Sequence, residues 1–126
     1  TILIGAGRLG NAVSSFIARD TNGYRLIAAF DINPDLVGRE MSGVTIRPLE
    51  ELESFCREYK PVVAVLCVPR QSAVEVSGEL VRLGLKGFWN FSHYDLSVEH
   101  PEVTVENVHL GDSLMSLGYR LRNSGM

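Results

Sequence analysis

Short runs of apolar residues alternate along this chain with stretches of helical periodicity. The runs are almost continuously apolar, which is typical of parallel strands buried on both faces rather than of strands with one face in water. They lie at residues 2–4, 26–30, 44–46, 62–68 and 88–91, with a weaker run at 103–105. This alternation predicts an α/β fold in which a doubly wound, mostly parallel sheet is covered by helices.

Three helical patterns lie between these runs, and each gathers apolar residues on one helix face. The faces comprise Leu9, Ala12, Phe16 and Ile17, then Leu49, Leu52, Phe55, Cys56 and Tyr59, then Ala73, Val76, Leu80 and Leu83. Gly84 follows the third pattern, where a glycine readily caps a helix C-terminus. The chain therefore supplies helices of the number and spacing that the predicted sheet needs.

Size and charge restrict the function. With 126 residues the chain can bury one ordinary core, and its pattern begins inside a strand at Thr1, so we expect a single domain cut from a longer chain. No apolar run approaches the roughly 20 residues of a membrane span. The net charge is -3 without a basic block, which argues against DNA binding by this segment itself.

The two cysteines, Cys56 and Cys67, form no CxxC pair, and each lies in an apolar pattern. This favours core thiols in a reducing, cytoplasmic setting, while a redox-active Cys67 is the alternative.

The glycines at positions 5, 7 and 10 lie between the first apolar run and the first helical pattern. In a Rossmann fold the first glycine permits a tight bend, the second lets the backbone approach a pyrophosphate, and the third allows the helix to pack closely on the sheet. A diphosphate there also faces the positive end of the helix dipole. The bland alternative is a tight strand-to-helix turn without a ligand.

Asp31 ends the second apolar run, 21 positions after Gly10. An acidic residue at about this offset accepts hydrogen bonds from a ribose 2′-hydroxyl and repels a 2′-phosphate, which favours NAD(H) over NADP(H). The alternative is that Asp31 opens the turn at residues 31–35 as an Asx-type residue, and the two roles are compatible.

Two further segments are expected at the carboxyl edge of the sheet. Pro69 ends the run that contains Val68, because proline cannot donate to a strand ladder. Asn90 and Phe91 end the next run, where an amide could hydrogen-bond a carboxamide and a phenyl ring could form an apolar wall. For Phe91, an ordinary place in the core fits the sequence equally well.

The sequence contains no catalytic constellation. Its histidines, His93, His100 and His109, lie late in the chain in mostly polar segments and make no helical metal motif. We therefore predict neither catalytic residues nor a metal site.

The phrases "GAGRLGNAV", "YRLIAAFDINPDLVGREMSGVTIRPLEELE", "AVLCVP" and "GFWNFS" follow one another at separations that resemble the nucleotide-binding domain of the Rex family, bacterial redox-sensing transcriptional repressors. The likeness covers about the first 95 residues and continues more loosely through "VTVENVHLGDSLMSLGYRL". It implies an upstream winged-helix domain, a homodimer, and binding to operator DNA that ends when NADH binds.

The resemblance also assigns the site. The residues of the first turn would hold the pyrophosphate, Asp31 the adenosine ribose, and the two later segments the nicotinamide; the full set is Gly5, Ala6, Gly7, Arg8, Leu9, Gly10, Asp31, Val68, Pro69, Asn90 and Phe91. An apolar pocket without a counter-ion disfavours the cationic oxidised ring, so we expect NADH to bind more tightly than NAD⁺.

Leu114, Leu117 and Leu121 form a helical stripe behind a predicted N-cap at Asp112. The stripe alone fits packing on the same chain's sheet. In Rex-like proteins this C-terminal helix crosses to the partner subunit in a domain swap, which implies dimerisation through it.

Three positions depart from the family pattern: Ser92-His93 replaces Ala-Pro after "NF", Val74 replaces a glutamine, and His109 replaces an acidic residue that couples nucleotide binding to the DNA-binding domains. The alternative reading is a CoA- or NAD-binding domain of an enzyme, similar to succinyl-CoA synthetase α subunits or to a dehydrogenase.

Overall fold

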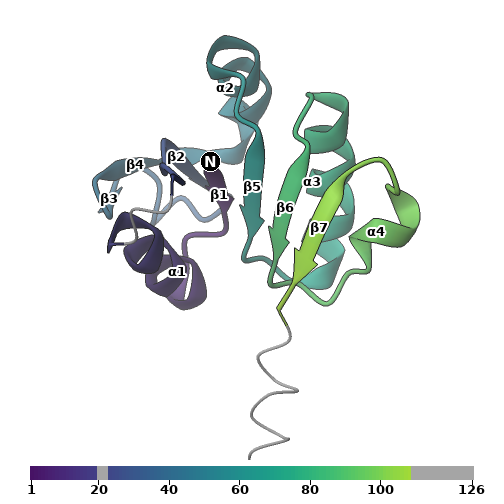
Figure 1. Ribbon diagram of the computed structural model, residues 1–126. Coiled ribbons are helices and arrows are strands. Elements are labelled where there is room, and N and C mark those ends of the chain that lie inside the picture. The colour runs from purple at the N-terminus through teal and green to yellow at the C-terminus, as the bar shows by residue number, and fades with distance from the viewer. Residues whose placement is uncertain (20–22, 109–126) are drawn as a thin grey trace, which may run out of the picture.

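The structure is a computed structural model that describes residues 1–19 and 23–108 (Figure 1). Its strands are β1 (Ile2–Ile4), β2 (Ala28–Asp31), β3 (Glu40–Met41), β4 (Val44–Pro48), β5 (Val63–Leu66), β6 (Gly87–Asn90) and β7 (Thr104–Asn107). Its helices are α1 (Arg8–Arg19), a 3-10 turn at Leu49–Glu51, α2 (Leu52–Tyr59), α3 (Arg70–Arg82) and the short α4 (Leu96–Glu99).

The strands form one sheet in the order β3-β4-β2-β1-β5-β6-β7. All neighbouring pairs are parallel except β3 and β4, which form an antiparallel hairpin at one edge. The chain runs outward from β1 in both directions, so β1 and β5 flank the point where the winding reverses. In such sheets the crevice beyond the carboxyl ends of these two strands is the usual ligand site. The predicted α/β doubly wound fold is confirmed.

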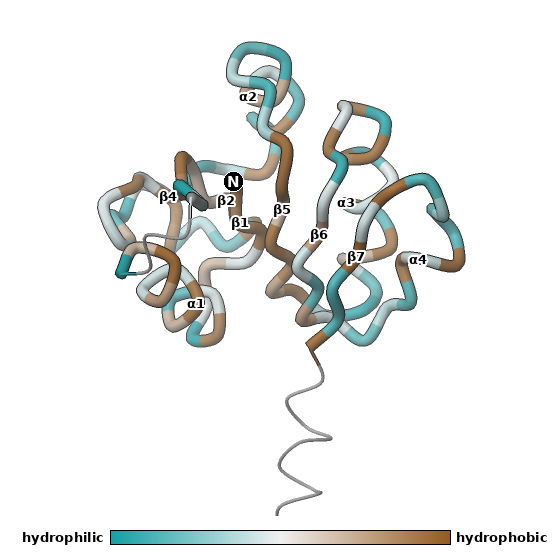
Figure 2. The backbone as a smooth tube through the Cα atoms, viewed as in Figure 1, coloured by the Kyte–Doolittle hydropathy of each residue, from teal (hydrophilic) through white to brown (hydrophobic). Residues whose placement is uncertain are grey.

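Two apolar layers hold the helices to the sheet. Helices α2, α3 and α4 cover one face with a cluster that includes Phe30, Leu52 and Leu80, each fully buried. On the other face, α1 places Val13 and Ile17 against Leu3 and Val65. Strands β1 and β5 are therefore apolar on both faces, which explains their continuous runs (Figure 2).

Helix α3 illustrates how local sequence sets its ends. Pro69, in an extended conformation, immediately precedes its first residue, and Gly84 follows its last turn with a φ of 99°. The N–H groups of Gly84 and Leu85 donate to the carbonyls of Val81 and Leu80, both at 3.1 Å, which completes a Schellman cap. The prediction of Gly84 as a cap is confirmed.

The structure also corrects details of the sequence-based elements. The run at 62–68 ends its strand at Leu66, because the Cys67 N–H makes its bond to Ile4 and the chain then turns towards α3. Pro69 therefore introduces the helix rather than ending the strand. In α1, Phe16 is 57% exposed although it was expected on the buried face, because Gly10, Val13 and Ile17 form that face instead. The β3–β4 hairpin and α4 were not predicted.

In the described residues no helix is both long and apolar enough to cross a bilayer. The predicted C-terminal helix, with its leucine stripe, lies outside the described residues, as does His109.

Candidate functional site

The first βα turn has the geometry that its glycines predict. Gly5 has a φ of 99°, and a Cβ on it would collide with the backbone carbonyl of Cys67, in the turn that leaves β5. A Cβ on Gly10 would collide with the Gly5 carbonyl, so α1 packs directly on the turn. A Cβ on Gly7 would meet no heavy atom within 4 Å. The turn is thus closed beneath and open above Gly7, as a phosphate cradle requires.

Helix α1 starts within this turn. Its first residue is Arg8, and the Asn11 N–H donates to the Gly7 carbonyl at 2.9 Å. The N–H groups of a first helical turn have no partner in their own helix, so they and the exposed Arg8 side chain favour an anion at this end of α1. Leu9 is partly buried against the α1 face of the sheet. The turn can therefore hold a diphosphate through backbone groups and one cation.

Asp31 lies at the carboxyl end of β2, across from the glycine turn. One carboxylate oxygen, Oδ2, accepts the Ala6 N–H at 2.7 Å, and the other, Oδ1, accepts the Asn33 N–H at 2.8 Å. The second bond is the Asx-type turn that the sequence offered as an alternative, and it is present. The first bond joins the two segments that the sequence predicted would meet a nucleotide together.

The segment after β5 forms the other wall at the switch point. Val68 is partly buried in the layer of α2 and α3, and its Cγ1 would lie 2.9 Å from a Cβ on Gly5. Pro69 is exposed at the start of α3. Phe91 instead packs in the α1 layer, beside Cys67 and Trp89. Val68 and Phe91 therefore lie at the same sheet edge but on opposite faces, and the structure does not join them in one lining.

The side chain of Asn90 is fully buried and engaged within the protein. Its Nδ2 donates to the Tyr94 carbonyl at 2.8 Å and to Oδ1 of Asn107 at 3.0 Å. Its Oδ1 accepts from both the N–H and the hydroxyl of Ser92. Asn90 thus shapes the segment that follows β6 and fastens it to the end of β7. A contact of Asn90 with a nicotinamide carboxamide stays a prediction.

The cysteines have unreactive surroundings. Burial raises the pKa of the Cys67 thiol to about 12, and burial together with Glu79 raises that of Cys56 to about 11. Cys56 is fully buried, whereas Cys67 is partly accessible. At neutral pH both remain protonated, so neither is a ready nucleophile.

Metal ligands do not gather in the part of the chain that the structure describes, where no three His, Cys, Asp or Glu side chains could hold an ion. His100 instead lies 3.7 Å from the carboxylate of Glu102.

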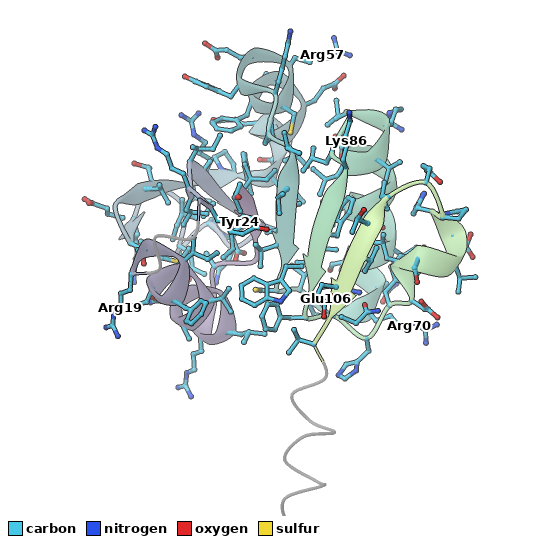
Figure 3. The ribbon with its side chains drawn as sticks, in the orientation of Figure 1. Arg19, Tyr24, Arg57, Arg70, Lys86 and Glu106 are labelled. Carbon is cyan, nitrogen blue, oxygen red and sulfur yellow. The ribbon has the colours of Figure 1, made fainter. Side chains whose placement is uncertain are left out.

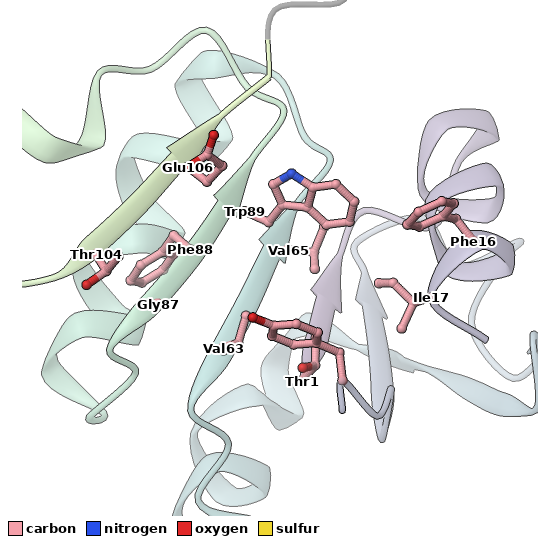
Figure 4. Close-up of a pocket in the computed structure, with 11 residues that line it drawn as sticks. Thr1, Phe16, Ile17, Val63, Val65, Gly87, Phe88, Trp89, Thr104 and Glu106 are labelled. Carbon is pink, nitrogen blue, oxygen red and sulfur yellow. The ribbon is translucent and has the colours of Figure 1, made fainter. Parts of the chain in front are cut away.

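A second feature was not anticipated from the sequence. A hollow of about 340 Å³ lies on the α1 face of the sheet, over β5, β6 and β7. Figure 4 shows Phe16 of α1 facing Trp89 across it, with their ring centroids 6.2 Å apart. Its lining also includes Thr1, Ile17, Tyr24, Val63, Val65, Gly87, Phe88, Thr104 and Glu106. We call it the β5–β7 groove.

Among the described residues, α1 is the one helix packed on this face of the sheet, and it lies on the side of β1, away from β7 (Figure 1). Tyr24 is 61% exposed at the groove, and Glu106 lies across from it on β7 (Figure 3). A signal for the groove was present in the sequence, because Phe16 is an aromatic residue next to the helix face that Val13 and Ile17 form.

The chain matches the family model described as "CoA binding domain" over residues 1–94. It is 43% identical over 122 residues to the redox-sensing transcriptional repressor Rex of Clostridium beijerinckii, an alignment that covers 97% of this chain and 57% of the relative. The chain therefore spans little more than half the length of this curated relative.

Two solved structures have the same fold at 40% identity. The protein RSP in complex with β-NADH superposes with a TM-score of 0.86, covering 98% of this chain and 59% of RSP. RSP in complex with β-NAD⁺ and operator DNA gives a TM-score of 0.85, covering 98% of this chain and 57% of RSP. These likenesses confirm the sequence resemblance: the chain belongs to the CoA-binding domain family and is a homologue of the Rex redox-sensing repressors.

Proposed function

We propose that this chain is the NAD(H)-sensing domain of a cytoplasmic, redox-responsive transcriptional repressor. The observation that carries the proposal is the pairing of an open glycine turn at Gly7 with the Asp31 carboxylate bonded across it to Ala6. A diphosphate at the turn brings its adenosine ribose to that carboxylate. The complexes of RSP with NADH and with NAD⁺ support the same class of ligand.

The response to redox state would come from the nicotinamide end. Val68 and Phe91 are apolar side chains at the same edge of the sheet, and neither supplies a counter-ion for the positive charge of an oxidised nicotinamide ring, so NADH is the favoured form. The chain acts as a binding domain rather than an enzyme. The operator would be bound by a winged-helix domain that precedes residue 1. The complex of RSP with operator DNA supports DNA as a partner of a relative of this kind.

The β5–β7 groove supports a homodimer. The chain leaves β7 beside this groove, and the residues that follow carry the stripe of Leu114, Leu117 and Leu121. A stripe of this kind needs an apolar surface, and the groove offers Phe16 and Trp89. The C-terminal helix of a second copy is the occupant we propose.

The family match favours one competing candidate, a CoA-binding domain of an enzyme. CoA carries a phosphate on its adenosine ribose, which the Asp31 carboxylate would repel. Calorimetric titration of the protein with NADH, NAD⁺, NADPH and CoA separates the candidates. We expect NADH to bind most tightly. CoA binding tighter than NADH would select the enzyme reading, and equal affinities for NADH and NAD⁺ would remove the redox preference.

A further inference from the structure

We infer that Asp31 is a positioning residue for the phosphate-binding turn, in addition to its proposed contact with the ribose. The inference deepens the proposed function and rests on it for the identity of the ligand. The claim that Asp31 holds the Ala6 N–H in the ligand-free protein does not depend on the proposed function.

The ladder between β1 and β2 explains why a side chain is needed. Ile4 is the last residue of β1 paired with β2, and the Gly5 N–H still donates to the Phe30 carbonyl at 2.9 Å. The positive φ of Gly5 then turns the chain away from β2. Ala6 is 5% exposed, and its N–H lies past the last paired residue of β1, so the strand ladder gives this buried group no acceptor. The Asp31 carboxylate takes that N–H at 2.7 Å and extends the connection between the strands by one residue.

The carboxylate is fixed by its second bond. Because Oδ1 accepts the Asn33 N–H while Oδ2 accepts the Ala6 N–H, its two oxygens are held by backbone groups 27 positions apart in sequence (33 minus 6). A carboxylate has about four acceptor sites. Each oxygen therefore keeps capacity for a ribose hydroxyl while it holds the turn.

This arrangement favours nucleotide binding because the turn has its shape before the ligand arrives. Ala6 immediately precedes Gly7, the position open to a phosphate. A backbone that is already ordered loses less entropy when it binds. Loss of the carboxylate should therefore weaken binding of the diphosphate itself, even for a ligand whose ribose cannot contact residue 31.

The first test uses the ligand-free protein. In NMR spectra the Ala6 amide proton of the wild type should be shifted downfield and protected from exchange. Asp31→Ala should increase its exchange rate by about tenfold, as expected for loss of a charge-assisted hydrogen bond. Asp31→Asn keeps one acceptor oxygen and should give an intermediate rate. Asp35→Ala removes the same charge from the same turn at an exposed site and should leave Ala6 unchanged. An Ala6 amide insensitive to both Asp31 variants overturns the inference.

The second test uses ADP and 2′,3′-dideoxy-ADP, which lacks the diol. If Asp31 contacted only the ribose, Asp31→Ala would bind the dideoxy ligand as well as the wild type does, or better, because a negative charge is gone. We expect it instead to bind about five- to tenfold more weakly, with Asp35→Ala equal to wild type. Equal binding by Asp31→Ala overturns the positioning role in binding. If the wild type bound neither ADP nor NADH, the proposed function would fail. The exchange rate of the Ala6 amide proton would still show whether Asp31 positions the turn.

Discussion

Trp89 and Phe91 pack ring against ring, with centroids 4.9 Å apart and planes inclined at 58°. Trp89 lines the β5–β7 groove, and Phe91 lies at the carboxyl edge of the sheet beside Cys67. With Phe16 on the far side of Trp89, three aromatic rings connect α1, the groove and the candidate nucleotide site. The three side chains therefore form one continuous line of ring contacts between these places.

Replacement of Phe91 tests the nicotinamide end of the site. Phe91→Ala should weaken NADH binding about three- to tenfold, because an aromatic contact contributes about 0.5–1.5 kcal/mol. ADP, which lacks the nicotinamide, should bind with unchanged affinity in the same calorimetric titration. Val74→Ala, which shortens an exposed side chain on α3, is the control. Equal losses of affinity for NADH and ADP would mean that Phe91 packs in the core and does not contact the nicotinamide.

The glycine turn offers a matched pair of substitutions. In Gly10→Ala the new methyl group collides with the Gly5 carbonyl, so we expect a loss of about 1–3 kcal/mol in unfolding free energy. In Gly7→Ala the methyl group meets open space, so the unfolding free energy should stay within about 0.5 kcal/mol of the wild-type value. The same methyl group would occupy the phosphate position and weaken NADH binding at least about tenfold. Unchanged affinity in Gly7→Ala would show that no phosphate approaches there.

The sequence predicted those parts of the fold that local pattern determines. Continuously apolar strands, the glycine turn and the Gly84 cap each follow from a few neighbouring residues. The bond of Asp31 to Ala6 was not predicted, because it depends on how two strands align at their ends. The hydrogen bond between Asn90 and Asn107 was missed for the same reason, since Asn107 lies 17 positions away on the neighbouring strand.

The groove shows a different limit of sequence reasoning. Periodicity placed Phe16 on the buried face of α1, although the face is centred on Val13 and Ile17. Helical spacing alone cannot decide which of two adjacent stripes meets the sheet.

The Asn90 network predicts a graded loss of stability. Asn90→Ala removes four hydrogen bonds from a fully buried site and should lower the unfolding free energy by about 3 kcal/mol. Asn107→Ala removes a single partner at an exposed position and should cost about 1 kcal/mol. Urea denaturation measures both. Similar, small losses in the two variants would mean that the network does not hold the segment after β6.

Thiol chemistry provides a pH-dependent prediction. With a pKa of about 12, the Cys67 thiol has about one thiolate in ten thousand at pH 8, so native protein should be alkylated about a thousandfold more slowly than unfolded protein. The raised pKa favours the protonated thiol in the folded state. Its stabilising contribution is therefore complete below pH 9 and is lost as the pH rises towards 12. Cys56→Ala leaves Cys67 as the single thiol for the measurement. Rapid alkylation at pH 8 would instead support a redox-active Cys67.

The groove predicts how the proposed homodimer can be broken. Phe16→Glu places a charge opposite Trp89, and burying that charge against a second copy's leucine stripe would be costly, so sedimentation should show a monomer. Deleting residues 112–126 should have the same effect because it removes the stripe. Ile32→Glu introduces the same charge at a side chain that is 73% exposed and outside the groove lining, and it should leave the proposed dimer intact. Trp89 is the chain's single tryptophan, so its emission should shift to longer wavelength when the groove opens to water. A dimer that survives Phe16→Glu with unchanged Trp89 emission would place the subunit interface elsewhere.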